Sequence, residues 1–203
     1  MVHGDNRGLM MPPRVAPVQV VILPIAFHKE GVLDKAYEIK SELAKNFRVE
    51  MDDRDTYSPG WKFNYWEMKG VPLRLEIGPK DIENNQVTAV RRDTLEKFTI
   101  SMEGLTEKIG EILDDIHQNM FNMALKNREE KTYTTTDYEE IKRIMKETPG
   151  FVKTMWCGSR ECEDKLKEET SATIRCLPFE QEQLGDTCPF CGKKAEHMIY
   201  VAK

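Results

Sequence analysis

The stretch Val18-Gln19-Val20-Val21-Ile22-Leu23 decides the fold of the first half of this chain. β-Branched residues dominate it, which predicts a strand buried on both faces of an α/β sheet. Beyond a loop, apolar residues recur at helical spacing from Val32 to Leu43, and charged residues fill the other side. A buried strand followed by an amphipathic helix is the usual beginning of an α/β domain.

Further strands and a second helix complete this domain. Strands are predicted at residues 47–51, 71–77 and 86–92. In the middle one, apolar residues alternate with Arg74 and Glu76, which predicts a half-buried strand with a charged outer face. Apolar residues then mark a long amphipathic helix from Leu105 to Met123. We therefore expect an α/β fold, a mixed sheet flanked by helices, over residues 18–125.

The remainder of the chain is predicted to be a smaller α+β domain, residues 126–203. Residues 127–136, charged and then rich in threonine, are typical of a hinge. Asp137 is placed as the N-cap of a short helix. Short strands then surround a charged helix from Glu161 to Thr170.

Two close cysteine pairs lie in this second part, Cys157-x4-Cys162 and Cys188-Pro-Phe-Cys191-Gly. Two such loops brought face to face supply the four thiolates of a tetrahedral Zn²⁺ site. Four reduced thiols without metal, or a redox pair at Cys188 and Cys191, are the alternatives. Cys176 lies in a predicted strand and is expected to be a core thiol, and His197 could replace one thiolate.

Composition indicates a soluble globular protein. Of the 203 residues, 39% are hydrophobic and 32% charged, and the formal net charge is −5. The longest apolar run, residues 18–27, is interrupted and too short to span a membrane, and the first residues have no signal-peptide pattern. Clustered cysteines in such a chain favour the reducing cytoplasm and a metal. The acidic total does not favour a nucleic-acid partner, so any such site needs basic residues gathered on one face.

A loop from Asp53 to Trp66 combines charges with aromatic rings. Arg54 and Lys62 could reach phosphates. The rings of Trp61, Phe63, Tyr65 and Trp66 could stack on splayed bases. The alternative is that part of these rings only cover the sheet.

A second candidate is the pair of strands that carries Arg74, Glu76, Lys80, Arg91 and Arg92. On antiparallel strands these side chains could share one face and form a basic groove. Guanidinium groups can bond the acceptors of guanine, while Glu76 could accept from its amino groups. A solvated face with ion pairs is the alternative. No Gly-rich phosphate loop or activated nucleophile emerges, and His117 is expected at the surface.

Several segments resemble the C-terminal part of a prolyl-tRNA synthetase of the archaeal and eukaryotic type. These segments, in order, are His3 to Gly8 with Pro12 to Pro17, Pro59 to Asn64, Gly70 to Pro79, Ala89 to Thr94, Cys157 to Asp164 and Cys188 to Lys193. The resemblance implies an enzyme that activates proline with ATP and Mg²⁺ and esterifies it to tRNA(Pro). It assigns residues 18–125 to the class II anticodon-binding domain and the four paired cysteines to a structural zinc.

The same resemblance makes residues 1–17 the tail of the catalytic core and a linker, with Arg7 a candidate ATP contact. The other signature motifs of that core, which build the homodimer interface, are absent, so the chain alone is expected not to aminoacylate. The family ends in an aromatic residue, whereas this chain ends at Lys203. A fusion of the parent to a glutamyl-tRNA synthetase stays open. The rival hypothesis is a stand-alone, zinc-stapled module that binds RNA or protein.

Overall fold

The computed structural model describes residues 3–203, so Met1 and Val2 of the predicted core tail lie outside the described residues. The chain divides into two units between Asn122 and Met123, and each is described by itself. In the described part of the chain, no helix combines the length and apolar character that crossing a membrane requires.

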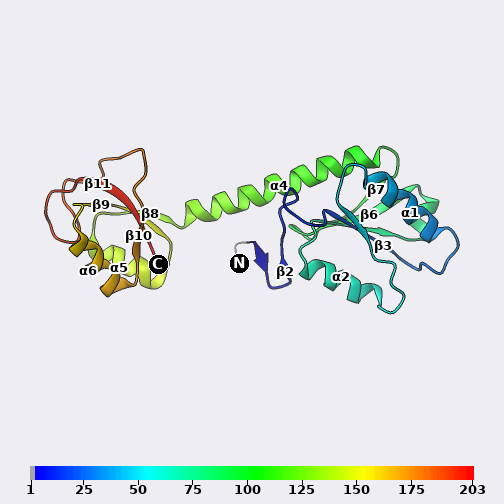
Figure 1. Ribbon diagram of the computed structural model, residues 1–203, viewed down its shortest axis with the longest axis horizontal. Coiled ribbons are helices and arrows are strands. Elements are labelled where there is room, and N and C mark those ends of the chain that lie inside the picture. The colour runs from blue at the N-terminus through cyan, green and yellow to red at the C-terminus, as the bar shows by residue number, and fades with distance from the viewer. Residues whose placement is uncertain (1–2) are drawn as a thin grey trace. The chain divides into compact units, whose positions relative to one another are not determined.

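The first unit is built on a five-stranded sheet (Figure 1). Its strands, in spatial order, are β4 (Val49–Met51), β3 (Val20–Pro24), β5 (Leu73–Ile77), β6 (Gln86–Arg91) and β7 (Lys97–Ser101). β3 runs parallel to both neighbours, whereas β5, β6 and β7 pair antiparallel. The predicted mixed α/β sheet is confirmed, with β7 as a further strand that the sequence pattern did not indicate.

Helices cover both faces of this sheet. The helices are α1 (Val32–Leu43), α2 (Pro59–Met68), α3 (Pro79–Glu83) and α4 (Leu105–Glu130). α1 and α4 bury their apolar stripes against strand residues such as Leu73 and Leu75. α2 lies on the opposite face, where Phe63 and Trp66 pack against Val21. Figure 1 shows this sheet between α4 and α2. Both faces of β3 are therefore buried, as its β-branched sequence predicts.

α2 corrects the prediction of a loop from Asp53 to Trp66. Ser58 is the N-cap of this helix, and its hydroxyl accepts a hydrogen bond from the Trp61 amide at 3.3 Å. Pro59 occupies the first helical position, where its missing N–H costs nothing. The dense mixture of charges and rings hid an ordinary helix start.

A short hairpin of β1 (Gly4–Asp5) and β2 (Gly8–Leu9) packs against the end of α2. A Cβ added to Gly8 would lie 2.6 Å from the Cα of Met68, and one on Gly70 would lie 2.7 Å from Leu9. Both glycines also have positive φ, 128° and 72°. No other residue fits either position without moving the hairpin away from the helix.

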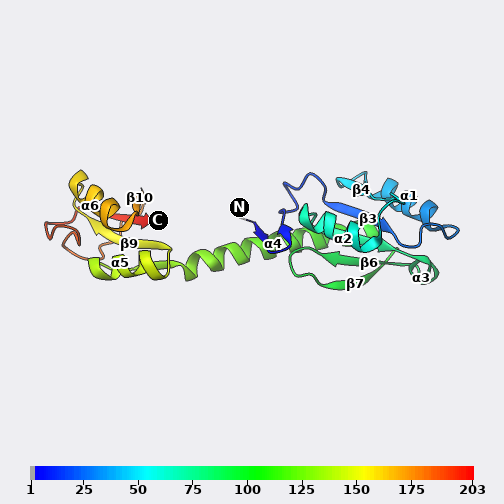
Figure 2. The same cartoon turned by 90° about the horizontal axis from the view of Figure 1, so that it is seen from below.

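The second unit contains a four-stranded sheet with two helices on one face. The strands, in spatial order, are β10 (Thr173–Cys176), β11 (His197–Ala202), β9 (Phe151–Trp156) and β8 (Thr132–Thr134). α5 (Tyr138–Glu147) and α6 (Arg160–Thr170) pack on it, and Asp137 caps α5 as predicted. The hinge predicted at residues 127–136 is wrong in part, because α4 continues to Glu130 and β8 follows directly. Figure 2 shows β9 beside both helices of this unit.

Candidate nucleic-acid interface and metal centre

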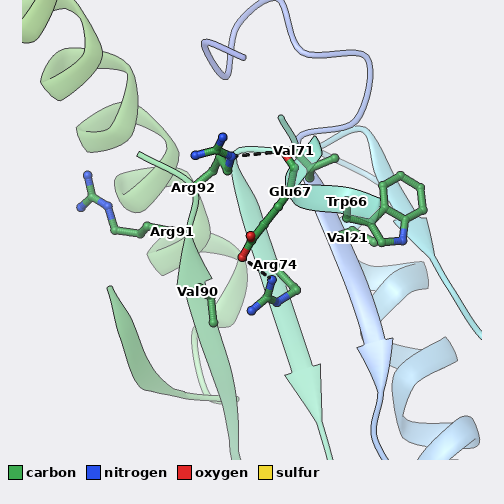
Figure 3. Close-up of a pocket in the computed structure, with 8 residues that line it drawn as sticks. All are labelled: Val21, Trp66, Glu67, Val71, Arg74, Val90, Arg91 and Arg92. Carbon is green, nitrogen blue, oxygen red and sulfur yellow. Dashed lines mark hydrogen bonds and ion pairs between the residues drawn. The ribbon is translucent and has the colours of Figure 1, made fainter. Parts of the chain in front are cut away.

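The register of β5 and β6 decides which predicted residues share a face. Arg74 lies opposite Val90, while Arg91 lies opposite Leu73. Because side chains alternate along a strand, Arg74 and Arg91 lie on opposite faces of the sheet, as Figure 3 shows. The prediction of one basic groove holding Arg74, Glu76, Lys80, Arg91 and Arg92 is therefore wrong. Lys80 is exposed on α3, outside both strands.

Arg74 and Glu76 belong to a network of ion pairs on the face of the sheet that α2 covers. The Arg74 guanidinium lies 3.3 Å from the carboxylate of Glu67 and donates to Glu76 at 3.1 Å. Glu76 also accepts from Lys97 at 2.7 Å. The ring of Phe63 lies 4.2 Å from the same guanidinium. The side chains of Arg74 and Glu76 are only 12% and 8% exposed, so the predicted charged outer face is covered.

Arg91 and Arg92 both form ion pairs with carboxylates of the chain itself. Arg91 pairs with Asp93 at 2.8 Å and with Asp115 of α4. Burial alone would raise the pKa of Asp93, but hydrogen bonds, chiefly from Arg91, outweigh it and lower that pKa. The Arg92 side chain is 3% exposed and donates two hydrogen bonds, of 2.7 and 2.9 Å, to the Asp5 carboxylate. Arg92 thereby fastens the β1–β2 hairpin to the sheet.

Lys62 is likewise an internal residue, held around Asp52. Its ammonium donates to the Asp52 carbonyl at 3.1 Å, and its side chain is only 4% exposed. The Asp52 carboxylate accepts from Arg54 at 2.6 Å and from the Trp66 indole at 2.8 Å. Burial raises the pKa of Asp52, but the hydrogen bonds from Arg54 and Trp66 reverse the shift. Of the two predicted phosphate contacts, only Arg54 therefore remains partly open to solvent.

Three rings form a stack on α2 and the turn before it, here called the aromatic ladder: Tyr57, Trp61 and Tyr65. The Tyr57 and Trp61 centroids are 3.9 Å apart, and those of Trp61 and Tyr65 are 5.0 Å apart. The planes differ by 13° and 15°. The Arg54 guanidinium lies 4.9 Å from the Tyr57 and Tyr65 centroids. Tyr57 was not singled out in the sequence, where the spacing of four residues from Trp61 was the available signal.

Glu67 is a further member of the network of ion pairs around Arg74, and the sequence pattern did not indicate it. It bonds Arg74 with one carboxylate oxygen, and the other lies 3.6 Å from Arg7. Its position four residues after Phe63 places both on one flank of α2 once the helix is recognised. Arg7, the predicted ATP contact, is otherwise largely exposed on the hairpin.

The four paired cysteines come together in the second unit. The sulfur atoms of Cys157, Cys162, Cys188 and Cys191 all lie within 4.8 Å of one another. Cys157 is 3.6 Å from both Cys162 and Cys191, close to the edge of about 3.8 Å that a tetrahedron with Zn–S bonds of about 2.3 Å has. The donor set and its spacing fit a tetrahedral Zn²⁺.

Backbone geometry supports each half of this thiol cluster. Gly158 and Gly192 directly follow a cysteine and have φ of 81° and 73°, which lets each loop turn sharply. Cys162 lies in the first turn of α6, where the helix dipole favours a thiolate.

Without a cation, burial raises the pKa of the Cys162 and Cys188 thiols. The backbone N–H of Lys193 lowers the pKa of Cys191 to about 7. A cation bound by all four sulfurs would favour the thiolate form throughout.

The remaining candidates fall outside the cluster. Cys176 is exposed, so the expected core thiol is wrong; a register shift after Ile174 carries it out of the packed face of edge strand β10. His197 begins β11 next to Trp156 and is not one of the clustered ligands. His117 is partly buried, with its Nδ1 enclosed, rather than at the surface.

Comparisons with known proteins match both units. Residues 19–112 match the family model described as "Anticodon binding domain". Residues 138–203 match the one described as "Prolyl-tRNA synthetase, C-terminal".

Curated relatives align with the whole chain. A protein named proline–tRNA ligase from Alkaliphilus oremlandii is 61% identical over 203 residues, and one from Acetoanaerobium sticklandii is 64% identical over 204. Proline–tRNA ligase 2 of Clostridioides difficile is 58% identical. All of this chain is covered in each case, but the chain spans only 42% of each relative's length. With both family models in the order that the two units have, the chain belongs to the prolyl-tRNA synthetase family and carries its anticodon-binding and C-terminal domains.

Proposed function

We propose that this chain supplies the tRNA-binding part of a proline–tRNA ligase, with its first unit reading the anticodon of tRNA(Pro). The observation that carries the proposal is the match of residues 19–112 to an anticodon-binding domain, together with the Phe63–Arg74–Glu76 cluster beside α2. For a whole protein of the relatives' length, we propose that it joins proline to tRNA with ATP and Mg²⁺ and that it forms a dimer. We propose residues 18–125 and 126–203 as the two functional domains.

The predicted RNA contacts take different roles in this proposal. Arg74 can donate to the O6 and N7 acceptors of guanine, and Glu76 can accept from its N1 and N2. Lys97, whose side chain is 60% exposed, marks the solvent side from which a base would approach them. For Arg54, which is partly exposed, and Lys80, which is exposed, we propose phosphate contacts at the margins. Lys62 and Arg92, which are almost fully buried, and Arg91, which lies on the opposite face of the sheet from Arg74, hold the surrounding structure. Arg74 is also bonded within the chain, to Glu67 and Glu76, so reading a base requires it to exchange at least one of these bonds.

We further propose that the four clustered cysteines bind a structural Zn²⁺. Four thiolates fill a tetrahedral site and leave no position for a substrate, which supports an architectural role. Free, clustered thiols also support a cytoplasmic setting. Metal analysis of the purified chain should give one zinc per chain with all four thiols protected from alkylation. A metal-free disulfide between Cys188 and Cys191 would instead support the redox alternative.

RNA binding can be measured by fluorescence anisotropy at fixed salt. The probes are a stem–loop with a proline anticodon and the same stem–loop with an unrelated anticodon. Arg74→Ala should reduce the preference for the proline stem–loop by about 1–3 kcal/mol, the range for one bidentate base contact. Arg160→Ala, which removes an exposed arginine of the second unit, is the control and should leave the preference unchanged. Equal loss on both RNAs would contradict base reading by Arg74.

A further inference from the structure

We propose that the aromatic ladder is a second RNA-binding surface, which stacks an unpaired nucleobase outside the triplet that the Arg74 cluster reads. This inference rests on the proposed function, because it assumes RNA bound to the first unit. It concerns a different flank of α2 and a different kind of contact.

Contacts of α2 separate its two flanks. Phe63 and Glu67 turn toward Arg74, on the side of β5. Trp61 and Tyr65 turn toward Arg54, which follows β4. Between them, Lys62 and Trp66 point inward to Asp52. A ligand on the ladder therefore does not compete with one on the Arg74 cluster.

The ladder has an open end. Tyr57 is its terminal ring and is 40% exposed, and Trp61 behind it is 41% exposed. The rings are already nearly parallel, so a base added to Tyr57 would extend an ordered stack without reorganising it. Rings that serve only to cover a sheet are enclosed, as Trp66 is by its contacts with the core and with Asp52.

Two cations lie beside the ladder. The Arg54 guanidinium flanks its middle, 4.9 Å from the Tyr57 and Tyr65 centroids and 5.3 Å from that of Trp61, and the exposed Lys69 places its ammonium 4.4 Å from the centroid of Tyr65. Asp53 and Asp55 adjoin Arg54 and oppose a phosphate there. The contribution of the ladder should thus come from stacking more than from charge, and should depend weakly on salt.

The test uses the stem–loop with a proline anticodon and anisotropy at several salt concentrations. Tyr57→Ala should weaken binding by about tenfold, within the range for one stacked base, with an unchanged salt slope. Tyr57→Phe keeps a ring and should bind like the parent. Phe121→Ala removes an exposed ring from α4 and is the matched control. Circular dichroism verifies that each variant is folded.

A second arm locates the base. Stem–loops with one abasic loop nucleotide outside the triplet are compared, and at one position Tyr57→Ala should add no further loss. Unchanged binding by both Tyr57→Ala and Trp61→Ala would overturn the inference and direct attention to a protein partner for this surface, while the Arg74→Ala result still decides the proposed function.

If the parent chain fails to bind any stem–loop, the proposed function fails separately. The ladder is then tested on a single-stranded oligouridine, because stacking tolerates any base. Equal binding by the parent and Tyr57→Ala would overturn the inference there too.

Discussion

The two units of this chain bury their interiors by different means. In the first, aliphatic side chains of β3, β5 and β6 meet α1 and α4 in a core of ordinary composition, and charged residues pair around it. In the second, Cys162 and Cys188 are themselves members of the core cluster, beside Ile141 and Val201. A metal bound by these sulfurs would be part of the packing. We therefore expect the first unit to fold without a metal, whereas folding of the second should depend on the metal that we propose for its four sulfurs.

Removing the metal should have the largest effect and should break the comparison most clearly. A strong chelator at neutral pH, or Cys188→Ser, should unfold the second unit while the first stays folded, because metal binding and folding are one equilibrium in small sites of this kind. Backbone amide NMR spectra of the two units report this directly. Cys176→Ser is the control, and loss of structure in both units would contradict their independence.

A cavity in the first core should have the next largest effect. Leu75→Ala should lower the free energy of unfolding of the first unit by about 2–5 kcal/mol, because Leu75 is fully enclosed. Urea titration with a spectroscopic probe in each unit measures it. Met68→Ala, at a largely exposed position, should cost little. A matching change in the chelator sensitivity of the second unit would show that the cores are coupled.

Acid should weaken the first unit through its buried carboxylates. Asp93 has a pKa below the ordinary value of 3.8 in the folded chain, despite burial, because of the hydrogen bonds from Arg91 and Asn119. Its stabilisation is thus complete above that ordinary pKa and is lost as the pH falls through the lower, folded-state pKa. Urea titrations from pH 6 to about 3 should show a decline that Asp93→Asn makes shallower. If stability declines equally with pH in Asp93→Asn and in the parent chain, Asp93 is not a cause of the acid sensitivity.

Removing a helix cap should have the smallest effect. The same kind of substitution can be made in both units, so the two can be compared directly. Ser58→Ala in α2 and Asp137→Ala in α5 each remove one side-chain cap and should cost about 1 kcal/mol. In thermal melts, the second variant should matter only in the metal-loaded chain. A cost for Asp137→Ala that persists after chelation would mean that α5 folds without the metal.

Local patterns predicted much of this molecule. β-Branched runs predicted β3, helical spacing predicted α1, and paired cysteines predicted the thiol cluster, because each is a short-range signal. The failures involve long-range geometry. Register between β5 and β6 separates Arg74 from Arg91, and the irregular pairing of β10 turns Cys176 outward. Neither follows from spacing within a single segment.

The partners of the charged residues were also beyond a single sequence. Lys62 resembles a phosphate contact until Asp52 is found beside it. Arg92 resembles a base contact until Asp5 is found beside it, 87 positions away along the chain. The prediction for α2 failed for a different reason. Ser58-Pro59 is a recognisable helix start, but the mixture of charged and aromatic residues around it led to the prediction of a loop.

The lock between the β1–β2 hairpin and α2 has a practical consequence for anyone who transplants this anticodon-binding domain into another protein. A graft that begins at residue 18 would omit Asp5 and leave the Arg92 guanidinium buried without its carboxylate. It would also uncover the backbone of Met68 and Gly70, against which Gly8 and Leu9 fit. The portable module therefore begins at the hairpin, and chimeras with related synthetases should exchange both sides of this joint together.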